Sequence, residues 1–275
     1  MGLRINTNMA SLSAQRVLSV QQKRAEHAAA ALSSGSRIIN AADDAAGLSI
    51  SESLRGQIRG ISQARNNAFN AGSAIQISEG GLNEISNILI RLRELGIQAA
   101  SDNIGDTERG FLNEEAKQII SEADRIAKTT RFGSKVLLDG SGGKMEFQVG
   151  AFGGDENRIG YDLSTNATSG AIGIDSIDLS DKDGARSTLN VVDEAIIKIG
   201  SMRANFGAIQ NRLQTAVSNL DIQHENLSAA NSRIRDTDIA RESAEMTSSR
   251  ILQEAAVSVL AQANTLPGMA LKLLS

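Results

Sequence analysis

The chain has 275 residues, of which 41% are apolar but only 3% aromatic, which suits thin helical layers better than a thick globular core. It has no cysteine, so disulfides and thiolate chemistry are excluded, and its two histidines, His27 and His224, stand too far apart to favour a zinc site. The net charge of −4 gives no electrostatic reason to expect nucleic acid or an anionic membrane as a partner.

The first element is expected to be a helix over residues 3–32, with a narrow apolar stripe that includes Ile5, Leu12 and Val17. A break follows at residues 33–36, because Ser-Ser-Gly-Ser interrupts the helical pattern. Asp43 and Asp44 then supply negative charge suited to the start of the next helix.

The second helix is expected over residues 45–100, and its apolar residues recur every seven positions. These seam residues are Leu54, Ile61, Ala68, Ile75, Leu82 and Leu89. A companion row three positions later carries small and apolar residues, which suits close contact with another helix. Gly80 and Gly81 each cost about 1 kcal/mol relative to alanine, and we expect the helix to continue through them.

A third helix is expected over residues 106–129, with Asp106 as its N-cap, and β-structure follows in residues 135–186. Residues 145–149 and 159–163 alternate apolar with polar residues or glycine around a Gly-Gly-Asp-Glu-Asn turn. This pattern predicts a β-hairpin, with residues 136–138 as a further strand, and a loop over residues 164–186.

The longest stripe runs through residues 187–234, where large apolar residues again recur every seven positions. They are Val192, Ile199, Phe206, Leu213, Leu220 and Leu227. Such a helix is roughly 70 Å long at about 1.5 Å per residue, and it can bury its stripe only against another long helix. We therefore predict a mainly α fold in which helices 45–100 and 187–234 form a long antiparallel, coiled-coil-like rod.

After a charged hinge at residues 235–238, the last helix is expected over residues 240–266 and is expected to end or kink at Pro267. Its apolar positions alternate in steps of four and three: Leu252, Ala256, Val259, Ala263 and Leu266.

The two terminal segments are amphipathic but offer few large apolar residues, whereas ordering backbone costs about 1–2 kcal/mol per residue. Alone they should be mostly unfolded, so their stripes are expected to be covered by other copies of the chain. We thus divide the chain into a rod, residues 45–235, and two segments that order on polymerisation, residues 1–44 and 236–275.

Several motifs, in order along the chain, resemble bacterial flagellin. They are MGLRINTN at residues 1–8, LSSGSRIIN at 32–40, ADDAAGL at 42–48, RLREL at 91–95, AIQNRL at 208–213 and AQAN at 261–264. The resemblance implies a motility protein that is secreted through a flagellar type III channel and polymerises beneath a cap protein into the extracellular filament. The terminal segments would form the inner coiled-coil tube of that filament.

The resemblance also implies further partners. An export chaperone would bind residues 239–275, hook–filament junction proteins would adjoin the polymer, and a host Toll-like receptor would contact Arg91, Leu95 and Glu115. Ile90 and Gly96 depart from the commoner residues of this motif.

Two alternatives remain open at this point: a hook–filament junction protein and a cytosolic coiled-coil signalling module. An enzyme is not expected. The sequence shows no catalytic or metal arrangement, and no cofactor is expected. His224-Glu225 begins like a zinc-protease motif, but Ser228 stands where the second histidine is required. No run of 18 apolar residues predicts insertion into a membrane, and the N-terminus does not resemble a cleaved secretory signal.

Overall fold

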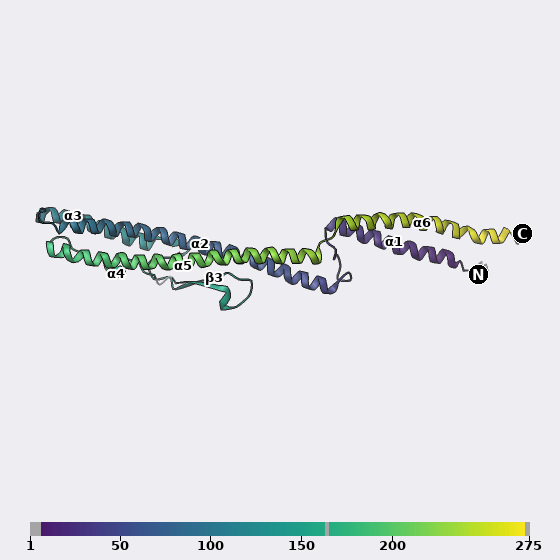
Figure 1. The fold of residues 1–275 in the computed structure, drawn as a ribbon, viewed down its shortest axis with the longest axis horizontal. Helices are drawn as coiled ribbons and strands as arrows, with labels where there is room; N and C mark the ends of the chain where they lie inside the picture. Colours follow the sequence, from purple (N-terminus) through teal and green to yellow (C-terminus); the bar gives the residue numbers. More distant parts are fainter. Residues whose placement is uncertain (1–6, 163–164, 273–275) are drawn as a thin grey trace. The chain divides into compact units, whose positions relative to one another are not determined.

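The computed structural model describes residues 7–162 and 165–272, and the side chains of residues 162, 266, 267 and 269–272 are outside that description. The fold is mainly α, as predicted, with two small antiparallel hairpins (Figure 1). The helices are α1 (Met9–Ser34), α2 (Ala45–Ala99), α3 (Asp106–Thr129), α4 (Ser169–Ile172), α5 (Lys182–Arg235) and α6 (Ile239–Lys272). The strands are β1 (Arg131–Phe132), β2 (Lys135–Val136), β3 (Lys144–Gln148) and β4 (Arg158–Asp162), and η1 (Asp155–Asn157) is a 3₁₀ turn.

The chain forms two compact units. Unit 1 comprises residues 1–56 and 226–275, and unit 2 comprises residues 57–225. Within unit 2, α2 and α5 run antiparallel, since Arg65 pairs with Asp221 and Arg93 pairs with Asp193.

Unit 2 buries the predicted seams of its two long helices. Ten seam residues are each no more than 5% exposed: Ile61, Ala68, Ile75, Leu82, Leu89, Val192, Ile199, Phe206, Leu213 and Leu220. Leu54 and Leu227, which belong to unit 1, are half-buried. Tyr161 of β4 packs on Phe206 at 5.3 Å between ring centroids and donates a 2.9 Å hydrogen bond to Ser78 of α2. Burial raises the pKa of Tyr161.

The α2 helix is continuous through Gly80–Gly81, as expected. A Cβ atom at Gly81 would lie 2.7 Å from Leu138 Cδ1 and 2.9 Å from Thr130 Oγ1, whereas one at Gly80 would meet nothing within 4 Å. Gly81 therefore gives the chain beyond α3 room to pack directly on α2, which offsets its cost in helix propensity.

The hairpin prediction is confirmed for β3 and β4, which pair antiparallel with Met145 opposite Tyr161. The expected third strand is wrong, because Val136 pairs with Arg131 in the separate β1–β2 hairpin. Leu163, the last residue of the predicted strand, lies outside the described residues.

The predicted start of α5 at Ser187 is also wrong, since the helix begins at Lys182 after a turn in which Asp181 accepts a hydrogen bond from the Gly184 amide. Similarly, Gly105 rather than Asp106 is the N-cap of α3, and the Glu108 carboxylate accepts a 2.6 Å bond from its amide.

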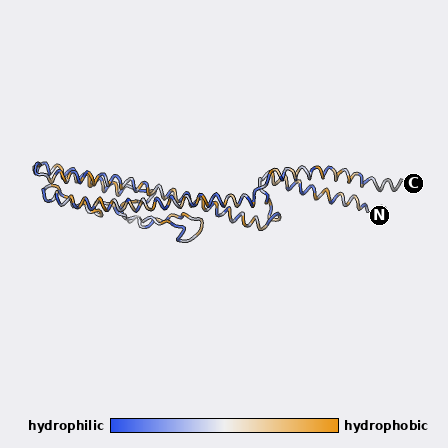
Figure 2. Tube along the Cα trace, in the orientation of Figure 1, coloured by the Kyte–Doolittle hydropathy of each residue, from blue (hydrophilic) through white to orange (hydrophobic). Residues whose placement is uncertain are grey.

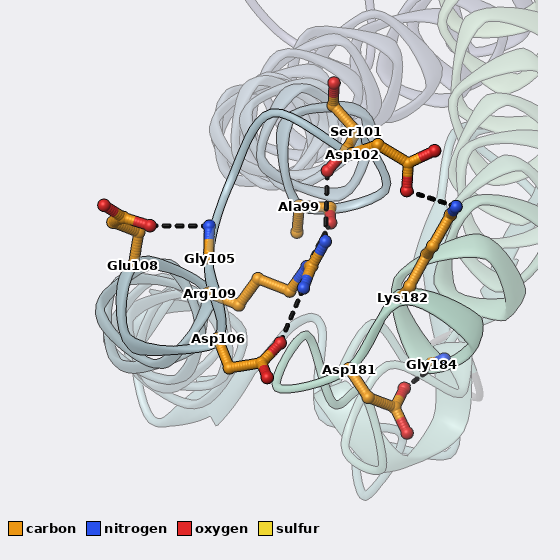
Figure 3. A network of polar contacts seen from close by, with 10 residues as sticks. All are labelled: Ala99, Ser101, Asp102, Gly105, Asp106, Glu108, Arg109, Asp181, Lys182 and Gly184. Carbon is orange, nitrogen blue, oxygen red and sulfur yellow. Dashed lines mark hydrogen bonds and ion pairs between the residues drawn. The ribbon is translucent and has the colours of Figure 1, made fainter.

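A polar network holds the α2–α3 turn to the start of α5 (Figure 3). The Arg109 guanidinium, on a side chain only 9% exposed, donates to the carbonyl oxygens of Ala99 and Ser101 and to the Asp106 carboxylate. Lys182, the first residue of α5, forms an ion pair with Asp102 of the same turn. The network supplies partners for carbonyls that the end of a helix leaves free.

The connection before α5 is more ordered than the predicted loop. Ile172, Ile174 and Leu179 are buried in the core of unit 2. Two residues of α3 hold this segment: Asn113 accepts from the Leu179 amide, and Asp124 accepts from the Ser169 amide and hydroxyl.

Unit 1 consists mainly of α1 and α6, which lie side by side and antiparallel (Figure 1). The segment that connects α1 to α2 and the segment that connects α5 to α6 hydrogen-bond to each other. The Arg37 amide donates to the Arg235 carbonyl over 2.7 Å, and the Thr237 amide donates to the Gly35 carbonyl over 3.0 Å. Arg235 also forms a 2.6 Å ion pair with Glu52.

Of the two outcomes expected at Pro267, an end of the helix is contradicted, because α6 continues to Lys272. Proline has no amide hydrogen for the carbonyl four residues earlier, which is that of Ala263. The side-chain amide of Asn8 donates to this carbonyl over 2.7 Å. Asn8, the N-cap residue of α1, thus donates the hydrogen bond that Pro267 cannot donate to Ala263.

Candidate self-assembly surface

The residues predicted to mediate polymerisation occupy two environments in unit 1. Ala256 and Ala263 are buried against α1, whereas Leu12, Val17, Leu252 and Val259 remain 45–54% exposed. Ile5 and the side chain of Leu266 lie outside the described residues.

The seam between α1 and α6 is made largely of small residues. Its buried members are Ser11, Ala14, Ala28, Ala31, Ser249, Ala256 and Ala263. The expectation of a single outward stripe on α6 was therefore wrong, because Ala256 and Ala263 belong to an intramolecular heptad seam. Their small side chains let the two helices approach closely, and Leu252 and Val259 are left on the flank of that seam.

An open groove runs along this flank. It is lined on α1 by Ala10, Ser13, Ala14 and Val17, and on α6 by Leu252, Ala255, Ala256 and Val259. Its volume is about 450 Å³. The structure thus brings together Val17, Leu252 and Val259, three residues singled out from the sequence, in one apolar depression.

Most of the groove lies in two uncharged stretches of the pair, whereas Val17 and Leu252 lie just beyond them, close to Arg16 and Glu254. Residues 5–15 contain no Asp, Glu, Lys or Arg, and neither do residues 255–271. Figure 2 shows apolar positions along both helices of this unit. Charged side chains are depleted where a surface becomes buried, so these stretches have the composition of an interface.

Two further exposed apolar residues, Leu12 of α1 and Val257 of α6, point away from the groove. Leu12 is five residues from Val17, and Val257 is five residues from Leu252, which places each about 140° around its helix from the groove residue. Leu12 and Val257 are 53% and 54% exposed, and neither lines the groove. Sequence reasoning missed Val257, although counting helical angle from the buried Ala256 would have found it.

The residues proposed for receptor contact lie on unit 2. The Arg91 guanidinium bonds the Glu115 carboxylate at 2.7 Å and Glu94 at 3.0 Å, which raises the pKa of Arg91. The Leu95 side chain is fully buried in the core, so it is absent from the surface that a receptor would meet.

The part of the chain that the structure describes shows neither a metal-binding cluster nor a membrane-spanning helix. Within it, no group of three or more His, Cys, Asp or Glu residues is arranged to hold a metal ion. No helix among these residues combines the length and apolar character needed to cross a bilayer.

Comparison with known proteins gives matches at both ends of the chain. The model of the bacterial flagellin N-terminal helical region matches residues 5–142, and that of the bacterial flagellin C-terminal helical region matches residues 189–274. A flagellin of Halalkalibacterium halodurans is 41% identical over 273 residues, covering 98% of this chain and 99% of the relative. A flagellar filament 30.7 kDa core protein of Treponema maltophilum is 38% identical, with 98% and 99% coverage.

Solved structures agree. The crystal structure of Bacillus cereus flagellin is 29% identical with a TM-score of 0.51, covering 60% of this chain and 94% of that chain. A putative flagellar hook-associated protein from Vibrio parahaemolyticus is 13% identical with a TM-score of 0.59, covering 70% and 100%, and shares the fold.

Family matches at both ends, 41% identity over nearly the whole length and the helical architecture lead to one conclusion: this chain belongs to the bacterial flagellin family and is a structural subunit that self-assembles into the flagellar filament, an extracellular appendage.

Proposed function

We propose that this filament subunit polymerises through the apolar groove on one flank of the α1–α6 pair. The observation that carries the proposal is the open groove between Val17 of α1 and Leu252 and Val259 of α6. All three side chains are about half exposed in a single chain, and another copy would bury the rest. At about 1.5–3 kcal/mol for full burial of each, roughly half remains to be gained per side chain.

The direct test places charge in the groove. Leu252→Asp with Val259→Asp should leave unit 2 helical by circular dichroism but abolish elongation from short filament seeds, followed by light scattering and electron microscopy. A matched control, Ser19→Asp with Gln22→Glu, adds the same charge at exposed positions of α1 outside the groove and should polymerise normally. Filaments of normal length from the groove variant would refute the proposal.

The same exposed surface supports the roles proposed for the other partners. An unassembled chain leaves the apolar side chains of α6 uncovered, and an export chaperone bound at residues 239–275 would cover them until secretion through the type III channel. The cap protein would receive the chain as its ends become ordered. The fold shared with the Vibrio hook-associated protein is compatible with hook–filament junction proteins as neighbours at the end of the polymer.

Recognition by a Toll-like receptor is proposed for the surface around Arg91 and Glu115. Both side chains are exposed and already paired with each other, so a receptor would have to engage the ion pair or compete for it. Leu95 supports this surface from beneath, because its side chain lies in the core.

A further inference from the structure

The buried seam between α1 and α6 defines the register of the two helices only weakly. On α6 its buried residues are Ser249, Ala256 and Ala263, which recur every seven positions, and those on α1 are likewise alanine or serine. If α6 moved along its axis by one heptad, about 10 Å, a small side chain would again meet a small side chain. Some other feature of the pair must therefore distinguish the observed register from a shifted one.

The interior of α6 carries one feature that does not repeat. Pro267 is the only proline of the chain, and it has no amide hydrogen. Among the described residues of α6, Ala263 is therefore the one interior position whose carbonyl oxygen has no amide donor four residues later. The carbonyl one heptad earlier belongs to Ala256, and it is followed at the same distance by Leu260, which has an ordinary amide.

Asn8 donates to this unusual carbonyl. Its side-chain nitrogen lies 2.7 Å from the Ala263 oxygen, while its side-chain oxygen accepts from the Ser11 amide over 3.1 Å. The second bond fixes the carboxamide at the N-cap of α1, so its nitrogen can meet α6 at one height only. We propose that Asn8 and Pro267 together set the register in which α1 and α6 pair: the proline frees one acceptor, and Asn8 recognises it.

Two other contacts agree with the same register. The Gln253 side chain donates to the Gln21 carbonyl over 3.0 Å, and the Thr237 amide donates to the Gly35 carbonyl over 3.0 Å. Between successive contacts, the advances along the two segments differ by no more than three residues, which is less than a heptad. Gln253 could find a backbone carbonyl in a shifted register too, whereas Asn8 requires the one that precedes a proline.

The register decides which side chains of the two helices meet at the surface. The groove exists because Val17 and Leu252 lie along the same depression. A shift of one heptad would put Glu245 or Val259 at the height of Leu252, depending on the direction, and Glu245 would bring a charge into the groove. Assembly through any surface of this pair needs a single register. The inference therefore goes beyond the proposed function and does not depend on it.

Engineered disulfides measure the register directly, because the chain has no cysteine of its own. Ala14 and Ala256 are buried and line the same groove from opposite helices, so the variant Ala14→Cys/Ala256→Cys reports the observed register. Ala14→Cys/Ser249→Cys and Ala14→Cys/Ala263→Cys report a shift of one heptad in either direction. A heptad is about 10 Å of helix, which exceeds the distance of about 7 Å between Cα atoms that a disulfide can span.

Filaments of each variant are equilibrated in a glutathione buffer and denatured, and the internal disulfide is quantified in the species of monomer size. Disulfides between copies are excluded because they give dimers. The quantity measured is the ratio of the disulfide of the observed register to those of the shifted registers. With Asn8 and Pro267 intact, the observed register should dominate.

Asn8→Asp keeps the acceptor for the Ser11 amide but removes the donor to Ala263. The ratio should fall about fivefold or more, which corresponds to a hydrogen bond of about 1 kcal/mol. Pro267→Ala should lower the ratio in the same way, because the Ala263 carbonyl is then no longer free. Gln15→Glu makes the same change of amide to carboxylate at an exposed position of α1 and should leave the ratio unchanged.

A parent ratio in both Asn8→Asp and Pro267→Ala would overturn the proposal, since the seam or the connecting segments would then set the register. A loss in Asn8→Asp alone would also overturn it, because the new charge rather than the free acceptor would be the cause. If a variant does not polymerise, the same ratio is measured on its dilute subunit against the parent subunit. Failure here is separable from failure of the groove as an assembly surface, because these disulfides form within one chain.

Discussion

The Asn8 side chain forms hydrogen bonds with both terminal helices. Its carboxamide oxygen accepts a 3.1 Å bond from the Ser11 amide and so caps α1, while its nitrogen donates to the Ala263 carbonyl beside Pro267. A proline in a helix interior usually costs about 3 kcal/mol, in part because it leaves such a carbonyl without a partner. The sequence pattern did not indicate that the helix continues past Pro267, because this hydrogen bond comes from 255 residues away.

Asn8→Asp separates the two roles of this residue. A carboxylate still accepts from the Ser11 amide but has no hydrogen to donate, so the Ala263 carbonyl loses its partner, at a cost of about 1 kcal/mol or more. Filaments of the variant should unfold at lower denaturant concentration than the parent.

The matched background is Pro267→Ala, which restores an amide hydrogen for Ala263. There, Asn8→Asp should cost much less, so a double-mutant cycle should show coupling between positions 8 and 267. Equal costs in both backgrounds would mean that the carbonyl does not depend on Asn8.

Asp124 is a second residue with a measurable role. Lys128, and then the amide and hydroxyl of Ser169, hold the pKa of Asp124 below its ordinary value. A group whose pKa is lower in the folded state stabilises that state above its unfolded pKa of about 4, and the contribution is lost as pH falls further.

Unfolding of unit 2 should therefore be insensitive to Asp124 ionisation between pH 5 and 8, taken as about one unit or more above that pKa, and should become easier below about pH 4. Asp124→Asn should flatten the acid limb of the stability curve, measured by circular dichroism in urea. An unchanged slope would show that this carboxylate is not linked to folding.

At the scale of elements, the periodicity of seven was sufficient to find the helices and most of the core of unit 2. Ile75, Leu82 and Leu89 of α2 and Ile199 and Phe206 of α5 are all buried. A long helix with apolar residues repeated along one face can bury them only against another helix. This part of the fold therefore follows from the sequence pattern.

Other elements carried no such pattern. The segment before α5 buries Ile172, Ile174 and Leu179 within a stretch rich in Ser, Gly and Asp, and its order depends on Asn113 and Asp124 of a distant helix. The division of the α6 stripe was missed for a related reason. Alanine is only weakly apolar, so periodicity alone did not reveal that Ala256 and Ala263 face α1 rather than another molecule.

Leu213 tests the helix pairing in unit 2. It is 3% exposed in α5, so Leu213→Asp would bury a carboxylate without a partner and should unfold the unit. We expect a large loss of helicity by circular dichroism. Ile222→Asp, on the same helix at a position 61% exposed, should leave helicity nearly unchanged. Retained helicity in the Leu213 variant would contradict the pairing.

At the scale of the molecule, the two units have cores of different quality. Unit 2 buries large residues such as Phe206 and Tyr161, whereas the α1–α6 pair of unit 1 buries mostly alanine and serine. Because burial stabilises in proportion to apolar area, unit 1 gains much less from its own contacts. Its exposed valine and leucine side chains would stabilise the unit only once the polymer buries them.

This contrast predicts which part of the chain changes on assembly. Unit 2 should be folded in the dilute subunit, while α1 and α6 should open frequently, since a seam of small residues barely offsets the cost of ordering their backbone. Polymerisation should stabilise α1 and α6 and leave the core of unit 2 little altered.

Amide hydrogen exchange measured on the dilute subunit and on the filament tests this most directly. We predict rapid exchange in residues 9–34 and 239–265 of the subunit, strong protection of the same residues in the filament, and similar protection of the unit 2 core in both. Terminal helices as protected in the dilute subunit as in the filament would contradict the account.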